Sequence, residues 1–186
     1  MAMKHIQSFA FVTFVSILLS ACASTNPPNA VAASSPSEKV APKPKPDYAS
    51  RVPKQIETSQ KVIVVYPSVH AWGAYNSNGS LLKAGIATAG ANWCPDINRA
   101  CRTKVGSFRI ASLGSASCKS SIYPLPRGGA PMPYCMFFNG NQGLHGSYNV
   151  VDGNASHGCV RLTVSDAEWV RFNFATIGTK VIVRPY

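Results

Sequence analysis

The segment Ala155-Ser-His-Gly-Cys-Val-Arg-Leu162 carries the groups that a cysteine nucleophile requires. A nucleophilic cysteine needs a nearby imidazole that holds its proton or stabilises its thiolate. Two histidines are close enough along the chain: His157 lies two residues before Cys159, and His145 lies upstream. Gly158 leaves backbone N–H groups accessible, as an oxyanion hole requires. This pattern predicts an enzyme with Cys159 as its nucleophile.

The two histidines differ in how they can approach the sulfur. His157 shares a short segment with Cys159, and alternate side chains of an extended segment lie on one face, so its geometry is constrained. His145 comes from a separate segment and can meet the sulfur from across the fold. Either histidine alone would more often be structural, but two histidines, a glycine and one cysteine together favour a catalytic site.

The N-terminus has the pattern of an export signal. The apolar run Phe9–Leu19 follows Lys4 and is too short to cross a bilayer, which takes roughly 20 residues. Leu19-Ser-Ala-Cys22 then resembles a bacterial lipobox, whose cysteine is acylated. The alternative is ordinary cleavage beside an incidental cysteine. We expect a lipoprotein signal peptide over 1–21 and a periplasmic protein anchored to a membrane by lipid on Cys22. Ala23, in place of Asp, resembles the enterobacterial signal for the outer membrane.

The remaining chain divides into a tether and a domain. Residues 22–60 are rich in Pro, Ser and Lys and hold too few large apolar residues to fold alone. Residues 61–186 predict one mostly β domain. Its expected strands are Lys61–Tyr66, His70–Tyr75, Ser80–Thr88, Phe108–Ile110, Tyr134–Phe138 and Thr179–Arg184. A helix is expected from about Ser165, with a capping box to Glu168 and an end at Gly178.

Six cysteines suggest three disulfides, but acylation of Cys22 would leave an odd number. If Cys159 is the free thiol, four cysteines can pair in three ways. We favour Cys94–Cys101, which closes a short loop containing a proline, and Cys118–Cys135, which closes a loop that otherwise lacks packing residues. The cysteine spacings are not those of a zinc site, and no metal is expected.

The net charge of +11, from 18 Lys and Arg against 7 Asp and Glu, favours an anionic partner. A nucleic-acid partner is not expected, because no run of basic residues alternates with stacking aromatic residues. A membrane surface or an acidic polymer fits the charge equally well.

The motif Ser156-His-Gly-Cys-Val-Arg161, with the upstream pair His145-Gly146, resembles the signature of L,D-transpeptidases, the YkuD-type catalytic domain. The likeness extends over most of residues 61–186, and the loop cysteines resemble a cysteine-rich branch of that family. The chain departs from the family pattern at Lys104, where a proline is usual. The resemblance implies a mostly β, sandwich-like domain with one or two short helices and no metal or organic cofactor.

The resemblance also implies the roles of individual residues. Cys159 is the expected nucleophile, His145 the general base, and the carbonyl of Gly146 the group that orients the imidazole. The backbone at His157, Gly158 and Cys159 is expected to form the oxyanion hole. Substrate contacts are expected from Ser156, His157 and Arg161, the last two with substrate carboxylates. For Arg161 the alternative is a structural ion pair with Asp152 or Asp166.

The implied reaction is acyl transfer on peptidoglycan stem peptides. Cys159 would attack the L,D-peptide bond of a tetrapeptide stem and release D-Ala, and an amine of a second stem or of an outer-membrane protein lysine would resolve the thioester. Water as the acceptor would make the enzyme an L,D-carboxypeptidase. A non-catalytic cell-wall-binding lipoprotein would need neither Cys159 nor His145. An unrelated cysteine peptidase would in most folds need a histidine after the cysteine, and none follows Cys159.

Overall fold

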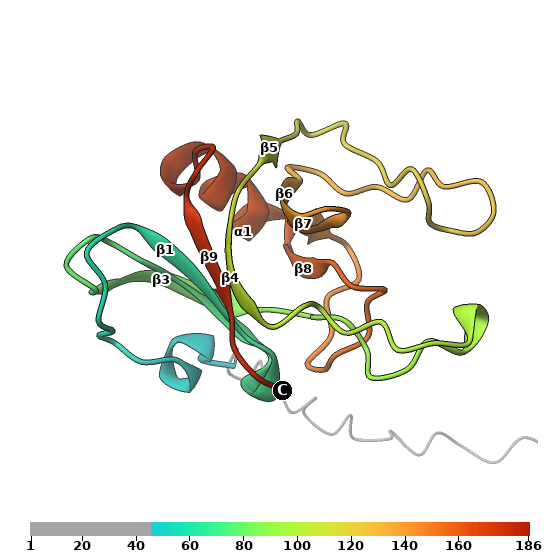
Figure 1. Ribbon diagram of the computed structural model, residues 1–186. Coiled ribbons are helices and arrows are strands. Elements are labelled where there is room, and N and C mark those ends of the chain that lie inside the picture. The colour runs from blue at the N-terminus through green and yellow to red at the C-terminus, as the bar shows by residue number, and fades with distance from the viewer. Residues whose placement is uncertain (1–45) are drawn as a thin grey trace, which may run out of the picture. The chain divides into compact units, whose positions relative to one another are not determined.

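A computed structural model describes residues 46–186, and its strands form two sheets that share one apolar core (Figure 1). The first sheet has the order β3-β2-β1-β9-β4, and the second has the order β5-β6-β7-β8. The first contains β1 Val62–Tyr66, β2 Ala71–Tyr75, β3 Leu81–Ile86, β4 Gly106–Arg109 and β9 Lys180–Val183. The second contains β5 Ser112–Leu113, β6 Met136–Asn139, β7 Gln142–Ser147 and β8 Val160–Thr163. The predicted mostly β, sandwich-like fold is confirmed.

Strand β1 occupies the centre of the first sheet because its residues suit a strand that is covered on both faces. It consists of β-branched residues and one tyrosine, and its first four side chains are buried. It pairs antiparallel with β2 and parallel with β9. Ile63 and Val65 enter the main core, while the alternate side chains of β1 join a smaller cluster around Tyr75. The predicted strands at β1 and β2 are confirmed.

Strands β7 and β8 are the parallel pair at one edge of the second sheet. Leu144, Val160 and Leu162 are fully buried in the main core. Burial of each such side chain contributes about 1.5–3 kcal/mol relative to exposure. The two strands that carry the candidate catalytic residues are therefore anchored by the core.

The short 3-10 helices are η1 Tyr48–Arg51, η2 Pro67–Val69 and η3 Pro95–Ile97. The expected longer helix is α1 Val164–Trp169, which continues as the π-helix η4 Val170–Phe174. The predicted capping box is wrong. Thr163, at the end of β8, caps the helix by accepting a hydrogen bond from the Asp166 N–H at 3.1 Å. Glu168 instead accepts one from the Tyr134 hydroxyl at 2.8 Å. Gly178 lies in the turn before β9, beyond the end of the helix.

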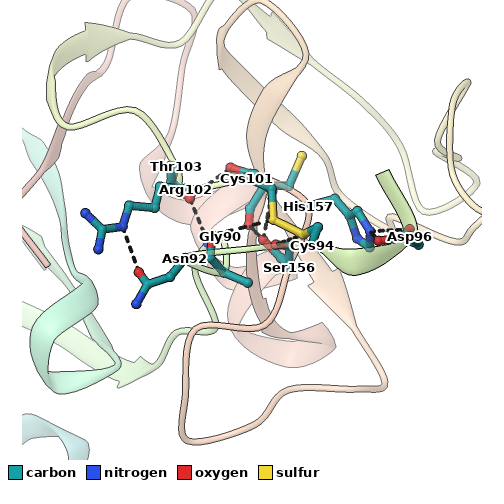
Figure 2. The surroundings of a disulfide bond; sticks show 12 residues. Gly90, Asn92, Cys94, Asp96, Cys101, Arg102, Thr103, Ser156 and His157 are labelled. Carbon is teal, nitrogen blue, oxygen red and sulfur yellow. Dashed lines mark hydrogen bonds and ion pairs between the residues drawn. A yellow bond between two sulfur atoms is a disulfide. The ribbon is translucent and has the colours of Figure 1, made fainter. Parts of the chain in front are cut away.

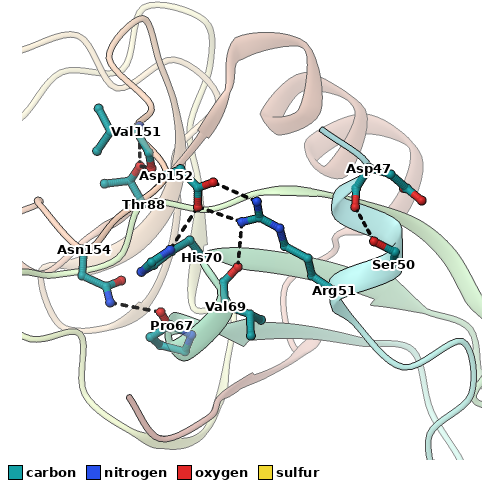
Figure 3. A network of polar contacts seen from close by, with 10 residues as sticks. All are labelled: Asp47, Ser50, Arg51, Pro67, Val69, His70, Thr88, Val151, Asp152 and Asn154. Carbon is teal, nitrogen blue, oxygen red and sulfur yellow. Dashed lines mark hydrogen bonds and ion pairs between the residues drawn. The ribbon is translucent and has the colours of Figure 1, made fainter. Parts of the chain in front are cut away.

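Some residues before Lys61, in the segment that composition assigns to the tether, contact the folded domain. Val52 is 6% exposed, and the Ile56 N–H donates to the Gly79 carbonyl at 3.0 Å. Arg51 makes two hydrogen bonds to the Asp152 carboxylate, at 2.7 and 2.8 Å (Figure 3). Because this segment is rich in proline, its composition does not indicate that a few of its residues are buried. The predicted signal peptide, Cys22 and most of the tether lie outside the described residues.

No helix within residues 46–186 is long and apolar enough to cross a membrane.

Both predicted disulfides are present: Cys94–Cys101 and Cys118–Cys135. Cys159 is the free cysteine of the described region. Each disulfide closes a loop with little regular structure, and both loops project from the same side of the second sheet (Figure 1). Residues of both loops line a cavity above β7 and β8.

Candidate active site

The candidate nucleophile lies in the bend that leads into β8. The Cys159 thiol is partly buried and donates a hydrogen bond to the Asn141 carbonyl at 3.3 Å. Burial raises the pKa of the thiol, while the backbone of Gly143 and the charge of Arg161 oppose that rise. Cys159 therefore rests as a neutral thiol near pH 7 and needs a base to become nucleophilic.

The candidate base, His145, lies in β7 and is only 6% exposed. Its Nδ1 is 2.8 Å from the Gly146 carbonyl oxygen, which can only accept, so Nδ1 carries the hydrogen. Nε2 then has the free lone pair of the neutral imidazole. Burial is the main cause that lowers the pKa of His145, and the nearby Arg161 lowers it further. The side chain is therefore uncharged at neutral pH, and the expected hydrogen bond from its Nδ1–H to the Gly146 carbonyl is present.

The register of β7 and β8 brings these groups together. His145 is the partner of Arg161 across the parallel pair. Cys159 lies in the bend directly before β8, two residues before Arg161. His145, Cys159 and Arg161 all line one cavity of about 900 Å³. A second cavity, of about 710 Å³, is lined by Arg102 and Tyr186 among others, and no cysteine is among its lining residues.

The turn before Cys159 requires a glycine. Gly158 has φ +120°, and a Cβ atom there would lie 3.1 Å from the Gln142 amide. The Ser156 hydroxyl accepts a hydrogen bond from the Gly158 N–H at 3.1 Å and donates one to the Cys159 carbonyl. The expected use of the Gly158 N–H in an oxyanion hole therefore does not fit, because Ser156 already binds it. Ser156 is 2% exposed and holds the turn in shape, although it also lines the cavity.

His157 has polar and aromatic partners of its own. Its Nε2 lies 2.7 and 2.9 Å from the two carboxylate oxygens of Asp96 (Figure 2). Its ring lies 4.4 Å from the ring of Tyr123, measured between centroids. His157 thus joins the two disulfide-closed loops at the wall of the cavity. The expectation that it receives a substrate carboxylate fits poorly, because Asp96 already occupies its Nε2.

Arg161 makes no ion pair with any acid in residues 46–186. The alternative of a structural pair with Asp152 or Asp166 is therefore wrong. Asp152 binds Arg51, and Asp166 lies 3.0 Å from the Lys83 ammonium. Burial lowers the pKa of Arg161, which stays charged because the ordinary value is so high.

Sequence reasoning missed the residues that support the catalytic turn. The Gln142 side chain accepts a hydrogen bond from the Lys104 N–H at 2.9 Å and donates one to the Arg102 carbonyl at 3.2 Å. A proline at position 104, as is usual in the family pattern, could not make the first bond. The Thr103 hydroxyl donates to the Gly158 carbonyl at 2.8 Å. Isolated Gln and Thr side chains carry no sequence signal for such roles.

Cys94, Asp96 and His157 place possible metal ligands within 4.8 Å of one another. Cys94 is bonded to Cys101, so its sulfur cannot act as a thiolate ligand. Asp96 and His157 alone are too few for a metal site of the usual kind.

A family model matches the part of the chain that carries this arrangement. The model of the L,D-transpeptidase catalytic domain, YkuD, matches residues 60–183. This chain belongs to the L,D-transpeptidase catalytic domain family. The family predicted from the motif around Cys159 is thus confirmed. No match was found among curated proteins.

Solved L,D-transpeptidases share the fold. One from Xylanimonas cellulosilytica is 22% identical with a TM-score of 0.60, over 73% of this chain and 65% of that chain. One from Mycobacterium smegmatis is 20% identical with a TM-score of 0.55, over 68% and 59% of the two chains. L,D-transpeptidase 3 from Mycobacterium tuberculosis, in complex with a faropenem-derived adduct, is 23% identical with a TM-score of 0.53, over 67% and 60%. The chain spans less than two thirds of each of these structures.

Proposed function

We propose that this chain is an active L,D-transpeptidase that acts on peptidoglycan stem peptides. The observation that carries the proposal is the pairing of β7 with β8, which puts a free thiol and a neutral imidazole in the lining of one cavity. A protein that only binds the cell wall has no need of both groups, nor of a backbone carbonyl that fixes the imidazole tautomer.

The proposed reaction begins with proton transfer. His145 Nε2 takes the proton of the Cys159 thiol as the sulfur attacks the carbonyl carbon of the L,D-peptide bond in a tetrapeptide stem. The protonated imidazole then gives that proton to the departing amine of D-Ala. The Nδ1 hydrogen bond to Gly146 holds the ring while its charge changes. A thioester between Cys159 and the third residue of the stem remains.

An amine then resolves the thioester. In the cross-linking reaction this is a side-chain amine of a second stem. His145 removes its proton as the new amide forms, the bond to the Cys159 sulfur breaks, and the imidazolium returns the proton to the departing thiolate. A lysine amine of an outer-membrane protein would give protein attachment, and water would give L,D-carboxypeptidase activity. The reactions with these three acceptors share the same first half. An experiment on the products therefore identifies the acceptor.

Incubation of the mature protein with purified stem peptides, followed by mass spectrometry, tests the proposal. A cross-linked dimer together with free D-Ala is the expected result. D-Ala and a tripeptide without dimer would identify the carboxypeptidase. Unchanged stems with retained binding would identify a cell-wall-binding protein and refute the enzymatic proposal.

We further propose that the protein is exported to the periplasm and held by lipid on Cys22, in the outer membrane. The support is the sequence Leu19-Ser-Ala-Cys22, followed by Ala23. When cells that express Cys22→Ala are fractionated, we expect the protein in the soluble periplasmic fraction and no longer in the membrane fraction. Retention of that variant in the membrane without an acyl label would contradict lipid anchoring.

A further inference from the structure

Three cationic side chains line the cavity that contains Cys159, and no carboxylate of the described region lines it. They are Arg99, Lys119 and Arg161. None of the three lies within ion-pair distance of an acid of residues 46–186. The cavity is thus a concave site with three positive charges that the described protein does not neutralise.

The four acids that follow Glu57 in the sequence all have partners other than the three cations. The pairs are Asp96 with His157, Asp152 with Arg51, Asp166 with Lys83, and Glu168 with the Tyr134 hydroxyl. Since none of these four acids pairs with the cations, the cavity is open to an anionic ligand that would supply the complementary charge.

The three cationic residues belong to different segments, and the backbone of each is held by hydrogen bonds or strand pairing. The Arg99 carbonyl accepts a hydrogen bond from the Cys94 N–H at 2.9 Å inside the first disulfide loop. Lys119 follows Cys118 and forms a β-bridge with Pro131 across the base of the second loop. Arg161 lies in β8 opposite His145. Three segments of the chain therefore each contribute one positive charge to the cavity that contains the candidate nucleophile.

We propose that this cavity selects acidic stem peptides, in which the side-chain and α-carboxyl groups are free, over stems in which these groups are amidated. The proposal rests on the proposed function and specifies its substrate class. Arg161, half-buried beside the sulfur, binds one carboxylate closely, and the exposed Arg99 and Lys119 attract the others. An uncharged carboxamide of the same shape would lose the ionic part of each contact.

The test uses two synthetic tetrapeptide stems that are identical except for carboxamides in place of carboxylates. Release of D-Ala by the full chain should show a KM about tenfold higher for the amidated stem, with kcat within about twofold. Lys119→Gln and Arg99→Gln should each reduce the difference in KM between the two stems. Arg127→Gln is the matched control, because Arg127 belongs to the same disulfide loop as Lys119 but does not line the cavity. High salt should reduce the difference in KM between the two stems for the unaltered protein.

Equal KM values for the two stems, or a difference that Lys119→Gln and Arg99→Gln leave unchanged, would overturn the selectivity while D-Ala release upheld the proposed function. If neither stem releases D-Ala, the proposed function fails, and calorimetry on Cys159→Ala decides the selectivity. Binding of the acidic stem about tenfold tighter than the amidated stem would support it. Equal binding, or none, would overturn it.

Discussion

At the scale of residues, the candidate site depends on the protonation states of two side chains. Burial lowers the pKa of His145 and raises that of Cys159, so the resting pair is a neutral imidazole and a neutral thiol. This differs from a preformed thiolate–imidazolium pair, in which the charges would already be separated. In the proposed reaction the histidine therefore acts as a base during attack, and its loss should affect the rate directly.

The pH dependence follows from the direction of the His145 shift. His145 works when neutral, and its folded pKa lies below the ordinary value of 6.5. The kcat/KM for D-Ala release should fall as the pH drops through that lowered pKa, with a midpoint below 6.5, and should be fully present at neutral pH. The initial rate of D-Ala release, measured across the pH range, checks this pH dependence. A midpoint above 6.5 would mean that another group controls the rate.

Substitution of the two histidines separates their roles. His145→Ala should lower the rate of acyl-enzyme formation by about 10²–10⁴, because the thiol loses its base. His157→Ala should cost less, because His157 lies against Asp96 and Tyr123 at the cavity wall. The rate at which each variant protein gains mass during incubation with a carbapenem or a penem measures both effects. Normal acylation of His145→Ala, with a slow His157→Ala, would show that the roles are reversed.

Gly158→Ala tests the turn before the nucleophile. The φ of +120° is strained for any residue with a Cβ, at a cost of about 1–3 kcal/mol. We expect lower thermal stability and a loss of acylation rate, measured by denaturation and by mass gain. Gly153→Ala is the control, because Gly153 has no φ in that range and a Cβ there meets only Val151 at 4.0 Å. Equal effects at both positions would contradict a special role for Gly158.

At the scale of elements, sequence patterns predicted the apolar strands better than the strands of the site. The β-branched run of β1 and the alternation in β2 predict strands directly, and both disulfides followed from counting cysteines and from loop composition. Strand β7 was not expected, because Gln142-Gly-Leu-His-Gly-Ser147 has low β propensity and is held by its pairing with β6 and β8. The helix was expected, but its cap at Thr163 depends on where β8 ends.

The disulfides should contribute unequally to stability. Cys118–Cys135 has a sequence separation of 17, against 7 for Cys94–Cys101. In the chain-entropy model the double replacement of Cys118 and Cys135 by Ser should lower the free energy of unfolding by about 3 kcal/mol, and that of Cys94 and Cys101 by about 2 kcal/mol. Urea denaturation measures both. A larger loss for the shorter loop would show that local packing outweighs loop entropy.

At the scale of the whole molecule, the domain includes residues that its composition assigns to the tether. Motif reasoning located Cys159 and His145, since a catalytic motif is local in sequence. It left open whether Arg161 pairs with an acid, and it missed contacts such as that of Arg51 with Asp152, 101 residues apart. The family match begins at residue 60 and likewise leaves these N-terminal contacts out.

Truncation tests this boundary. A chain that begins at residue 61 loses the buried Val52, the Ile56 pairing and the Arg51 ion pair. It should be less stable than a chain that begins at residue 46 by about 2–4 kcal/mol, mainly through lost apolar burial. Thermal denaturation of the two chains provides the comparison. Equal midpoints would show that residues 46–60 only rest on the surface.

The most direct test of the central claim is D-Ala release from a purified tetrapeptide stem, followed by mass spectrometry of the intact protein. The unaltered chain should release D-Ala and gain the mass of the tripeptide acyl group, and Cys159→Ala should do neither. Thiol labelling of the unaltered chain confirms that its nucleophile is reduced. Release of D-Ala by Cys159→Ala, or none by a fully reduced unaltered chain, would contradict catalysis by Cys159.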